Sequence, residues 1–301
     1  MTATAPAGAP GIRLALGPHG PAVERALRRL DASRAVERLW ARDASLWPGD
    51  RAEIAARLGW LDALEAPSDE EAALPEAREL AAWAAARGLT HAAVVGMGGS
   101  SLAPELFGRV LRAAGGLAPF VLDSTHPDAV RAADAALDPL RTLFVVSSKS
   151  GTTIETTTLA RHALARVGAA LAAAGSDEAP GGRFVAITDP GSALAETARE
   201  GGFRAVFDGP PDVGGRFSAL TPFGLVPAVL YGADVASIRG AAARMAHACG
   251  SPGGAAAGGE ASTVAAGIDV PAHPARAAHA TGGAPRAAAN PAALLGAAMA
   301  A

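Results

Sequence analysis

Short runs of apolar residues recur through the middle of the chain, and each run is apolar on both faces. They occupy residues 92–95, 119–122, 143–146, 183–187 and 204–207. A strand that is apolar at consecutive positions is buried on both sides, which is typical of a parallel sheet. The runs are separated by roughly 20–40 residues, enough for a crossover helix and its loops. The pattern predicts an α/β fold, in which a three-layer, doubly wound parallel sheet of five strands has helices on both faces.

Apolar residues at helical spacing flank this central region. They predict N-terminal helices over 21–41, from Asp50 onwards and over 75–87, and Asp50 with Glu53 has the character of a capping box. Further helices are expected over 218–231 and 235–249, and a short one over 290–301.

These changes of pattern divide the chain into five regions. We expect a flexible lead-in over 1–20, a helical region over 21–88, the sheet domain over 89–234 and a helix in 235–250. Residues 251–301 are mostly Ala, Gly and Pro, with few large apolar side chains to offset chain entropy. That composition predicts a linker or disordered tail, with 251–287 the part least able to pack.

Composition and charge exclude several function classes. The net charge is −3 and no basic face is concentrated, so a general nucleic-acid binder is not expected. No apolar run reaches the roughly 18 residues of a membrane span, and the N-terminus lacks the pattern of a signal peptide. The single cysteine, Cys249, excludes an intramolecular disulfide and a cysteine-cluster metal site. We therefore expect a cytoplasmic protein that binds neither nucleic acid nor membrane and holds no metal.

Ligands of an open parallel sheet bind at the carboxyl ends of its strands. The loop after the first strand, Gly96 to Ser101 (GMGGSS), has three glycines and two serines where a helix begins, which suits an anion. It matches neither the dinucleotide fingerprint nor a P-loop. A tight strand-to-helix turn without a ligand explains it equally well.

The loop after the third strand is more informative. Residues 147–153 read SSKSGTT, so hydroxyls surround one glycine at a helix start, and the chain's only lysine, Lys149, lies among them. Hydroxyl groups, backbone N–H groups and the positive end of a helix together can hold a phosphate. An N-cap alone would need only one of these hydroxyls, so a binding role is favoured over a purely structural one.

Other loops carry weaker signals. Residues 188–192 predict a turn into a helix capped by Ser192, and His126 is expected to act as a cap or in a turn. Arg216 follows Gly214 and Gly215 before a helix, where a rigidly held guanidinium can stabilise a developing oxyanion. An isolated arginine is more often a solvated surface residue, so this assignment depends on the setting.

These loops, in this order, resemble the glucose-6-phosphate isomerase family, in particular its first sugar-isomerase (SIS) domain. The resemblance is carried by GMGGSS after the first strand, SKSGTT at 148–153 and GGRFS at 214–218. With EIAARLGWLD at 53–62 and AITDPGSAL at 186–194, it is most similar to the isomerase part of bacterial transaldolase fusions. The likeness covers about residues 26–249, with a weaker echo over 290–301.

The resemblance implies roles for particular residues. It assigns phosphate binding to eight of them, and assigns stabilisation of an enediolate to Arg216. The eight are Gly99, Ser100, Ser148, Lys149, Ser150, Gly151, Thr152 and Thr153. The implied reaction interconverts glucose 6-phosphate and fructose 6-phosphate by proton transfer, without a cofactor, in glycolysis and gluconeogenesis. Members of the family usually form homodimers, so a second copy of the chain is an expected partner.

The sequence departs from the family where the chemistry needs a base. The family's glutamate, in an ESxGK-like segment of its second SIS domain, has no match, nor do the histidine and lysine that follow it. Residues 251–301 then correspond to the start of a missing second domain. Three interpretations remain open: an isomerase with an incomplete chain, a non-catalytic phosphosugar-binding SIS module, and a fragment that folds without function.

Overall fold

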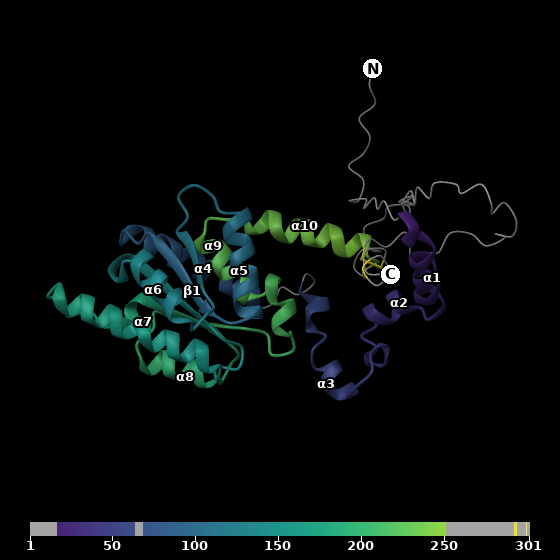
Figure 1. Ribbon diagram of the computed structural model, residues 1–301, viewed down its shortest axis with the longest axis horizontal. Coiled ribbons are helices and arrows are strands. Elements are labelled where there is room, and N and C mark those ends of the chain that lie inside the picture. The colour runs from purple at the N-terminus through teal and green to yellow at the C-terminus, as the bar shows by residue number, and fades with distance from the viewer. Residues whose placement is uncertain (1–16, 64–68, 251–291, 294–298, 300–301) are drawn as a thin grey trace, which may run out of the picture. The chain divides into compact units, whose positions relative to one another are not determined.

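The computed structural model describes residues 17–63, 69–250, 292, 293 and 299 (Figure 1). These residues form two compact units, one made of residues up to 55 and from 240 onwards, the other of residues 56–239. The expected tail over 251–287 lies outside the described residues, as do most of the lead-in and of the helix over 290–301.

The larger unit is built on a five-stranded sheet in which every neighbouring pair of strands is parallel. The strands are β1 (His91–Gly96), β2 (Ala118–Leu122), β3 (Thr142–Ser147), β4 (Phe184–Thr188) and β5 (Ala205–Asp208). Their spatial order is β2-β1-β3-β4-β5. This confirms the predicted doubly wound sheet, and the limits of each predicted strand lie within one residue of the observed ones.

Helices cover both faces of the sheet, as the apolar runs require. A cluster of buried side chains lies between the sheet and the helices on each face. On one face the helices are α4 (Asp69–Ala86) and α9 (Pro222–Leu230). On the other face they are α6 (Pro127–Ala136), α7 (Ile154–Ala173) and α8 (Ala193–Glu200). Helix α5 (Gly99–Val110) packs against α9 and β2. Alternate residues of one strand enter opposite clusters: Val145 lies in the first and Val146 in the second.

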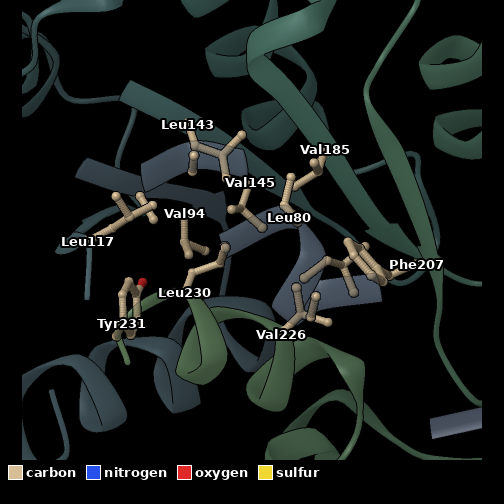
Figure 2. Close-up of a cluster of buried hydrophobic side chains, with 14 of the residues drawn as sticks. Leu80, Val94, Leu117, Leu143, Val145, Val185, Phe207, Val226, Leu230 and Tyr231 are labelled. Carbon is tan, nitrogen blue, oxygen red and sulfur yellow. The ribbon is translucent and has the colours of Figure 1, made fainter. Parts of the chain in front are cut away.

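Figure 2 shows the first cluster, where Val226 and Leu230 of α9 lie against Val94 and Val145 of the sheet. Tyr231, at the end of α9, is fully buried there. Its hydroxyl has no hydrogen-bond partner within the described part of the chain, and burial raises its pKa above the ordinary value. The core is therefore closed by aliphatic packing, with one polar atom left unpaired inside it.

Three predicted helices have different limits in the structure. The helix over 21–41 is interrupted by Arg34, whose φ of 52° is left-handed, which leaves α1 (Gly20–Ala32) and α2 (Ala35–Trp40). The helix expected from Pro75 begins at Asp69, because a proline does not prevent the helix-favouring residues before it from forming a turn. The helix over 218–231 is divided at Thr221, whose backbone is extended and whose side chain caps α9 by accepting from the N–H of Phe223.

The remaining helices are short or do not cover a face of the sheet. Asp50 accepts hydrogen bonds from the backbone N–H groups of Ala52 and Glu53, as expected of a cap, but α3 extends only over Arg51–Ala55. Helix α10 extends over Val235–Ala248. The 3-10 turns are η1 (Gly17–His19), η2 (Ala44–Leu46), η3 (Gly59–Asp62), η4 (Pro139–Arg141), η5 (Pro180–Arg183) and η6 (Gly215–Leu220).

Candidate functional site

The order in which the chain adds strands to the sheet reverses between β1 and β3. Strand β2 lies on one side of β1 and strands β3 to β5 lie on the other, so the crossovers leave β1 and β3 in opposite directions. In doubly wound sheets the crevice at such a switch point, at the carboxyl ends of the strands, is where ligands bind. Gly96 and Ser147, the last residues of β1 and β3, are aligned across this point. The two loops singled out from the sequence start here.

The turn from β1 into α5 is tightly fitted. Gly98, with φ of 55°, precedes the helix, and its carbonyl accepts hydrogen bonds from Ser101 and Leu102. A Cβ at Gly96 would lie 2.8 Å from the carbonyl oxygen of Ser147, so this position admits no side chain. Ser101 uses its hydroxyl inside the turn, whereas that of Ser100 forms no hydrogen bond within the described part of the chain. Ser100 is thus the serine of this turn that keeps a free donor.

The backbone of α5 touches the segment that carries Arg216. A Cβ on Gly99 would lie 2.3 Å from both the carbonyl carbon and the carbonyl oxygen of Gly215. The contact sets η6, and with it Arg216, against the first turn of α5. Arg216 is exposed and forms no ion pair or hydrogen bond with the described residues. Arg216 therefore lies on a segment whose backbone contacts the Gly99–Ser100 turn, and its guanidinium is not engaged by the described residues.

The loop from β3 into α7 is held by its own hydroxyl groups. Ser148 donates to Thr153 at 3.3 Å and accepts from the N–H of Gly151 at 3.2 Å. Ser150 and Thr152 share a hydrogen bond of 3.0 Å, and both side chains are exposed. Gly151 has φ of 69°, and a Cβ there would lie 2.7 Å from the backbone nitrogen of Leu194. The loop is preformed, with Ser150 and Thr152 directed to solvent.

Lys149 has a different environment from the hydroxyls around it. Its ammonium lies 2.9 Å from a carboxylate oxygen of Asp189 and 2.8 Å from the carbonyl oxygen of Pro210. The backbone N–H of Asp189 also donates to the carbonyl of Lys149. Lys149 thus ties the loop after β3 to the segments that follow β4 and β5, and its charge is already balanced by a carboxylate.

Two helices begin at the switch point without a capping side chain. No side chain accepts from the first N–H groups of α5 or α7, whose N-cap residues are Gly98 and Thr153. By contrast α6, α8 and α9 are capped by His126, Ser192 and Thr221, as expected for the first two. In α5 the N–H groups of Ser100 and Ser101 donate to the backbone carbonyls of Met97 and Gly98. The first N–H groups of α7 and the positive ends of both helices are therefore what is left for an anion.

An aromatic pair lies next to Arg216. Phe217 stacks on Trp60 of η3, with ring centroids 5.1 Å apart and planes 15° from parallel. Leu58 pairs with Val213 in an isolated bridge, and the N–H of Gly59 donates to the carbonyl of Asp212. These contacts join the segment around Arg216 to residues 58–60.

Sequence reasoning found the residues of both loops but not their supports. The Gly99–Gly215 contact, the Lys149–Asp189 pair and the role of Gly96 appear only in the structure. The sequence held one signal for the ion pair. Lys149 and Asp189 follow adjacent parallel strands, whose loops meet at one edge of the sheet, and the two side chains carry opposite charges. Within the described residues no group of His, Cys, Asp and Glu side chains could hold a metal ion, and no helix there is long and apolar enough to cross a bilayer.

The fold and the site define an α/β domain with a doubly wound parallel sheet, whose switch point carries hydroxyl-rich loops and two helix ends without a capping side chain. A profile of the phosphoglucose isomerase family matches residues 74–253, and the chain belongs to that family. This confirms the resemblance seen in the sequence.

Individual relatives extend the comparison. The chain is 34% identical over 230 residues to a glucose-6-phosphate isomerase of Thermus thermophilus, an alignment that covers 75% of this chain and 48% of that protein. It is 39% identical over 160 residues to the enzyme of a Synechococcus species, covering 50% of this chain and 28% of that one. The chain therefore spans about half the length of these relatives, or less.

One solved structure has a related fold at comparable identity. The crystal structure of a hypothetical protein from Thermus thermophilus superimposes with a TM-score of 0.57 and 31% identity. The match covers 78% of this chain and 49% of that one. The family profile, over residues 74–253, includes all five strands of the sheet.

Proposed function

We propose that the Ser148–Thr153 loop, with Gly99 and Ser100, binds the phosphate of a sugar phosphate. The observation that carries this proposal is the convergence of two uncapped helix N-termini with the exposed hydroxyls of Ser150 and Thr152 at the switch point. Backbone and hydroxyl donors supply the binding, so a phosphate needs no free lysine there. Lys149 then acts as a positioning residue that holds the loop through Asp189.

Within this proposal the substrate is glucose 6-phosphate or fructose 6-phosphate, interconverted in glycolysis and gluconeogenesis in the cytoplasm. The reaction moves a proton between C1 and C2 through an enediolate, and needs no cofactor. Arg216, charged and unpaired beside Ser100, stabilises the negative oxygen of that intermediate. The step also needs a general base near C2.

The described residues offer no well-placed base. Glu155 follows the phosphate loop in sequence, and Asp189, 40 positions after Lys149, contacts the loop through that lysine. Asp189 is held by Lys149, and Glu155 is exposed in the first turn of α7. A missing base typically lowers a rate by about 10²–10⁴-fold. We therefore expect binding without robust isomerisation by this chain alone, which keeps a non-catalytic phosphosugar module as the second candidate.

Ligand-dependent stabilisation tests the binding site. Fructose 6-phosphate should raise the melting temperature and fructose should not, because a ligand stabilises the folded state that binds it. The double variant Ser150→Ala/Thr153→Ala should lose the shift. The matched variant Ser176→Ala/Thr197→Ala, which removes one serine and one threonine outside the loop, should keep it. An unchanged shift in the loop variant would exclude the loop.

A coupled assay for glucose 6-phosphate separates the two candidates. If formation of glucose 6-phosphate from fructose 6-phosphate does not exceed background, the result supports the non-catalytic binding module. If the chain forms glucose 6-phosphate and Arg216→Ala does not, the result supports an isomerase with a base inside this chain. In the second case Glu155→Gln is the next variant, because Glu155 follows the phosphate loop directly.

We also propose that the chain forms a homodimer through α5. Leu102, Leu106 and Val110 are 58%, 57% and 67% exposed and follow one another at four-residue steps along the helix. Glu105 and Arg109 flank this stripe and are paired within one helix. In an antiparallel pair centred on Leu106, Leu102 faces Val110 of the second copy. Glu105 then faces residue 107 and lies at equal offset from Glu105 and Arg109 of the second copy, so the pairing depends on the apolar stripe and not on these charges.

Engineered cysteines test this register. In a Cys249→Ser background, Leu106→Cys should form a disulfide-linked dimer, because residue 106 lies on the two-fold axis. Leu102→Cys should crosslink only when combined with Val110→Cys. One α5 face covers less than the roughly 800 Å² per partner of a standard interface, so the dimer should dissociate at micromolar concentration. A monomer at high concentration in analytical ultracentrifugation would contradict the proposal.

A further inference from the structure

A pocket lies between α4 and the start of α10, and none of its lining residues belongs to the two phosphate-site loops. Its volume is about 480 Å³, within the size range of small-molecule sites. Six residues line it: Leu74, Pro75, Arg78, Val235, Ala236 and Arg239. Leu74 and Val235 are buried in a hydrophobic cluster with Phe107 and Leu225, so the floor of the pocket is fixed by core packing.

The polar groups that line this pocket are two arginines, and none of the six lining residues carries a carboxylate. One guanidinium nitrogen of Arg239, Nη1, is buried and has no hydrogen-bond partner within the described part of the chain. Arg78 is exposed and also forms no ion pair or hydrogen bond with the described residues. Burying an unpaired cationic N–H is costly, and a second cation in the same pocket increases that cost.

Like Arg239, three further arginines of the described residues are half-buried or buried, and each of them is paired with an acid. Arg38 contacts Asp43, Arg166 contacts Asp134, and Arg183 contacts Glu178. The two arginines of the pocket differ in that their partner is not supplied by the described residues. Guanidinium groups bind carboxylate and phosphate through two parallel hydrogen bonds, so the missing partner has that chemistry.

We propose that this pocket binds a small organic dianion, with its phosphate or carboxylate groups on Arg78 and Arg239. The apolar body of the ligand rests on Leu74, Pro75 and Val235. The site is separate from the Ser148–Thr153 loop and does not depend on the proposed sugar-phosphate function. It is a second anion site of the same unit, recognised by side-chain charge instead of by helix ends.

Thermal unfolding tests this site with the phosphate loop disabled. The background is Ser150→Ala/Thr153→Ala, and the probes are phenyl phosphate and phthalate, a phosphate and a dicarboxylate on an apolar ring. A rise in melting temperature of about 2–5 °C is expected for at least one probe at concentrations well above its Kd. The probe that raises the melting temperature shows whether the pocket prefers a phosphate or a carboxylate. No rise with either probe would overturn the proposal.

Arginine variants locate the binding. Arg239→Met should abolish the rise, and the variant itself should be no less stable than its parent without probe, because a buried unpaired N–H is removed. Arg78→Met, which changes an exposed side chain and keeps the fold, should weaken the rise at least several-fold in apparent affinity. Arg112→Met, an exposed arginine outside the pocket, is the matched control and should change nothing. An undiminished rise in Arg78→Met, or an equal loss in Arg112→Met, would contradict the assignment.

Discussion

At the scale of single residues, the candidate site depends on places where a side chain cannot fit. Gly99 meets the backbone of Gly215, and Gly151 combines a left-handed φ with contact to Leu194. At both positions the missing side chain lets two backbone segments approach, and each contact joins the helix start to another part of the site. The glycines of the motif are thus needed for assembly of the site as well as for turning the chain.

Alanine at Gly99 should therefore separate Arg216 from the Gly99–Ser100 turn. Its Cβ would lie 2.3 Å from the Gly215 carbonyl, so η6 must move, at a cost of about 1–3 kcal/mol of unfolding free energy. The melting-temperature shift with fructose 6-phosphate should decrease as well. Urea denaturation and ligand-dependent melting measure the two effects.

Gly215→Ala is the matched control from the other side of the same contact. Its Cβ would lie 3.7 Å from the Cα of Gly99, an ordinary van der Waals distance. This variant should keep both stability and ligand response. Equal damage in the two variants would show that the approach of these backbones is not what the site requires.

At the scale of elements, the sequence predicts strands better than helix limits. Each strand is a two-faced apolar run, and burial on both faces leaves few alternatives for residues such as Val145 and Val146. Helix limits depend on local competition: Arg34 adopts a left-handed conformation that arginine rarely favours, and Asp69 starts a helix before Pro75. For the Lys149–Asp189 pair the sequence offers opposite charges after adjacent strands, but the contact itself depends on how two loops 40 positions apart are oriented after folding.

An ion-pair cluster joins the end of α4 to the connection between α7 and β4. Hydrogen bonds from Arg87, and then from Arg183, hold the pKa of Glu178 below its ordinary 4.5. A lowered pKa means that the stabilisation is present above about pH 4.5 and is lost as the pH falls through the lowered value. Because Glu178 is 44% exposed, the contribution should stay below ~1 kcal/mol.

Glu178→Gln should therefore be less stable than the wild type at pH 7, and the difference should shrink as the pH falls below 4.5. Urea unfolding at pH 7, 5 and 3.5 measures it. Glu200→Gln, at the exposed end of α8, is the control and should show no such pH-dependent difference. A difference that persists unchanged at pH 3.5 would assign the effect to packing instead of charge.

At the scale of the whole molecule, the sheet, both helical layers and every candidate site residue lie in the unit of residues 56–239. Residues 56–239 expressed alone should therefore unfold cooperatively, because both faces of the sheet remain covered. The melting-temperature shift with fructose 6-phosphate should also be retained. Circular dichroism and thermal melting test this, with the full chain as control. A broad, non-cooperative transition would show that the other unit contributes to the fold.

The buried Tyr231 gives the protein an optical signal of its own opening. It is the chain's single tyrosine, so any absorbance of phenolate must come from this one ring. While the unit is folded, burial keeps the ring protonated, whereas an exposed tyrosine loses its proton near pH 10. Because the folded state retains a proton that the unfolded state releases, stability falls as the pH rises above that value. After rapid transfer into alkaline buffer, Tyr231 would therefore ionise at the rate at which the core around it opens. The absorbance of the phenolate, followed over time, would measure the opening rate of this domain.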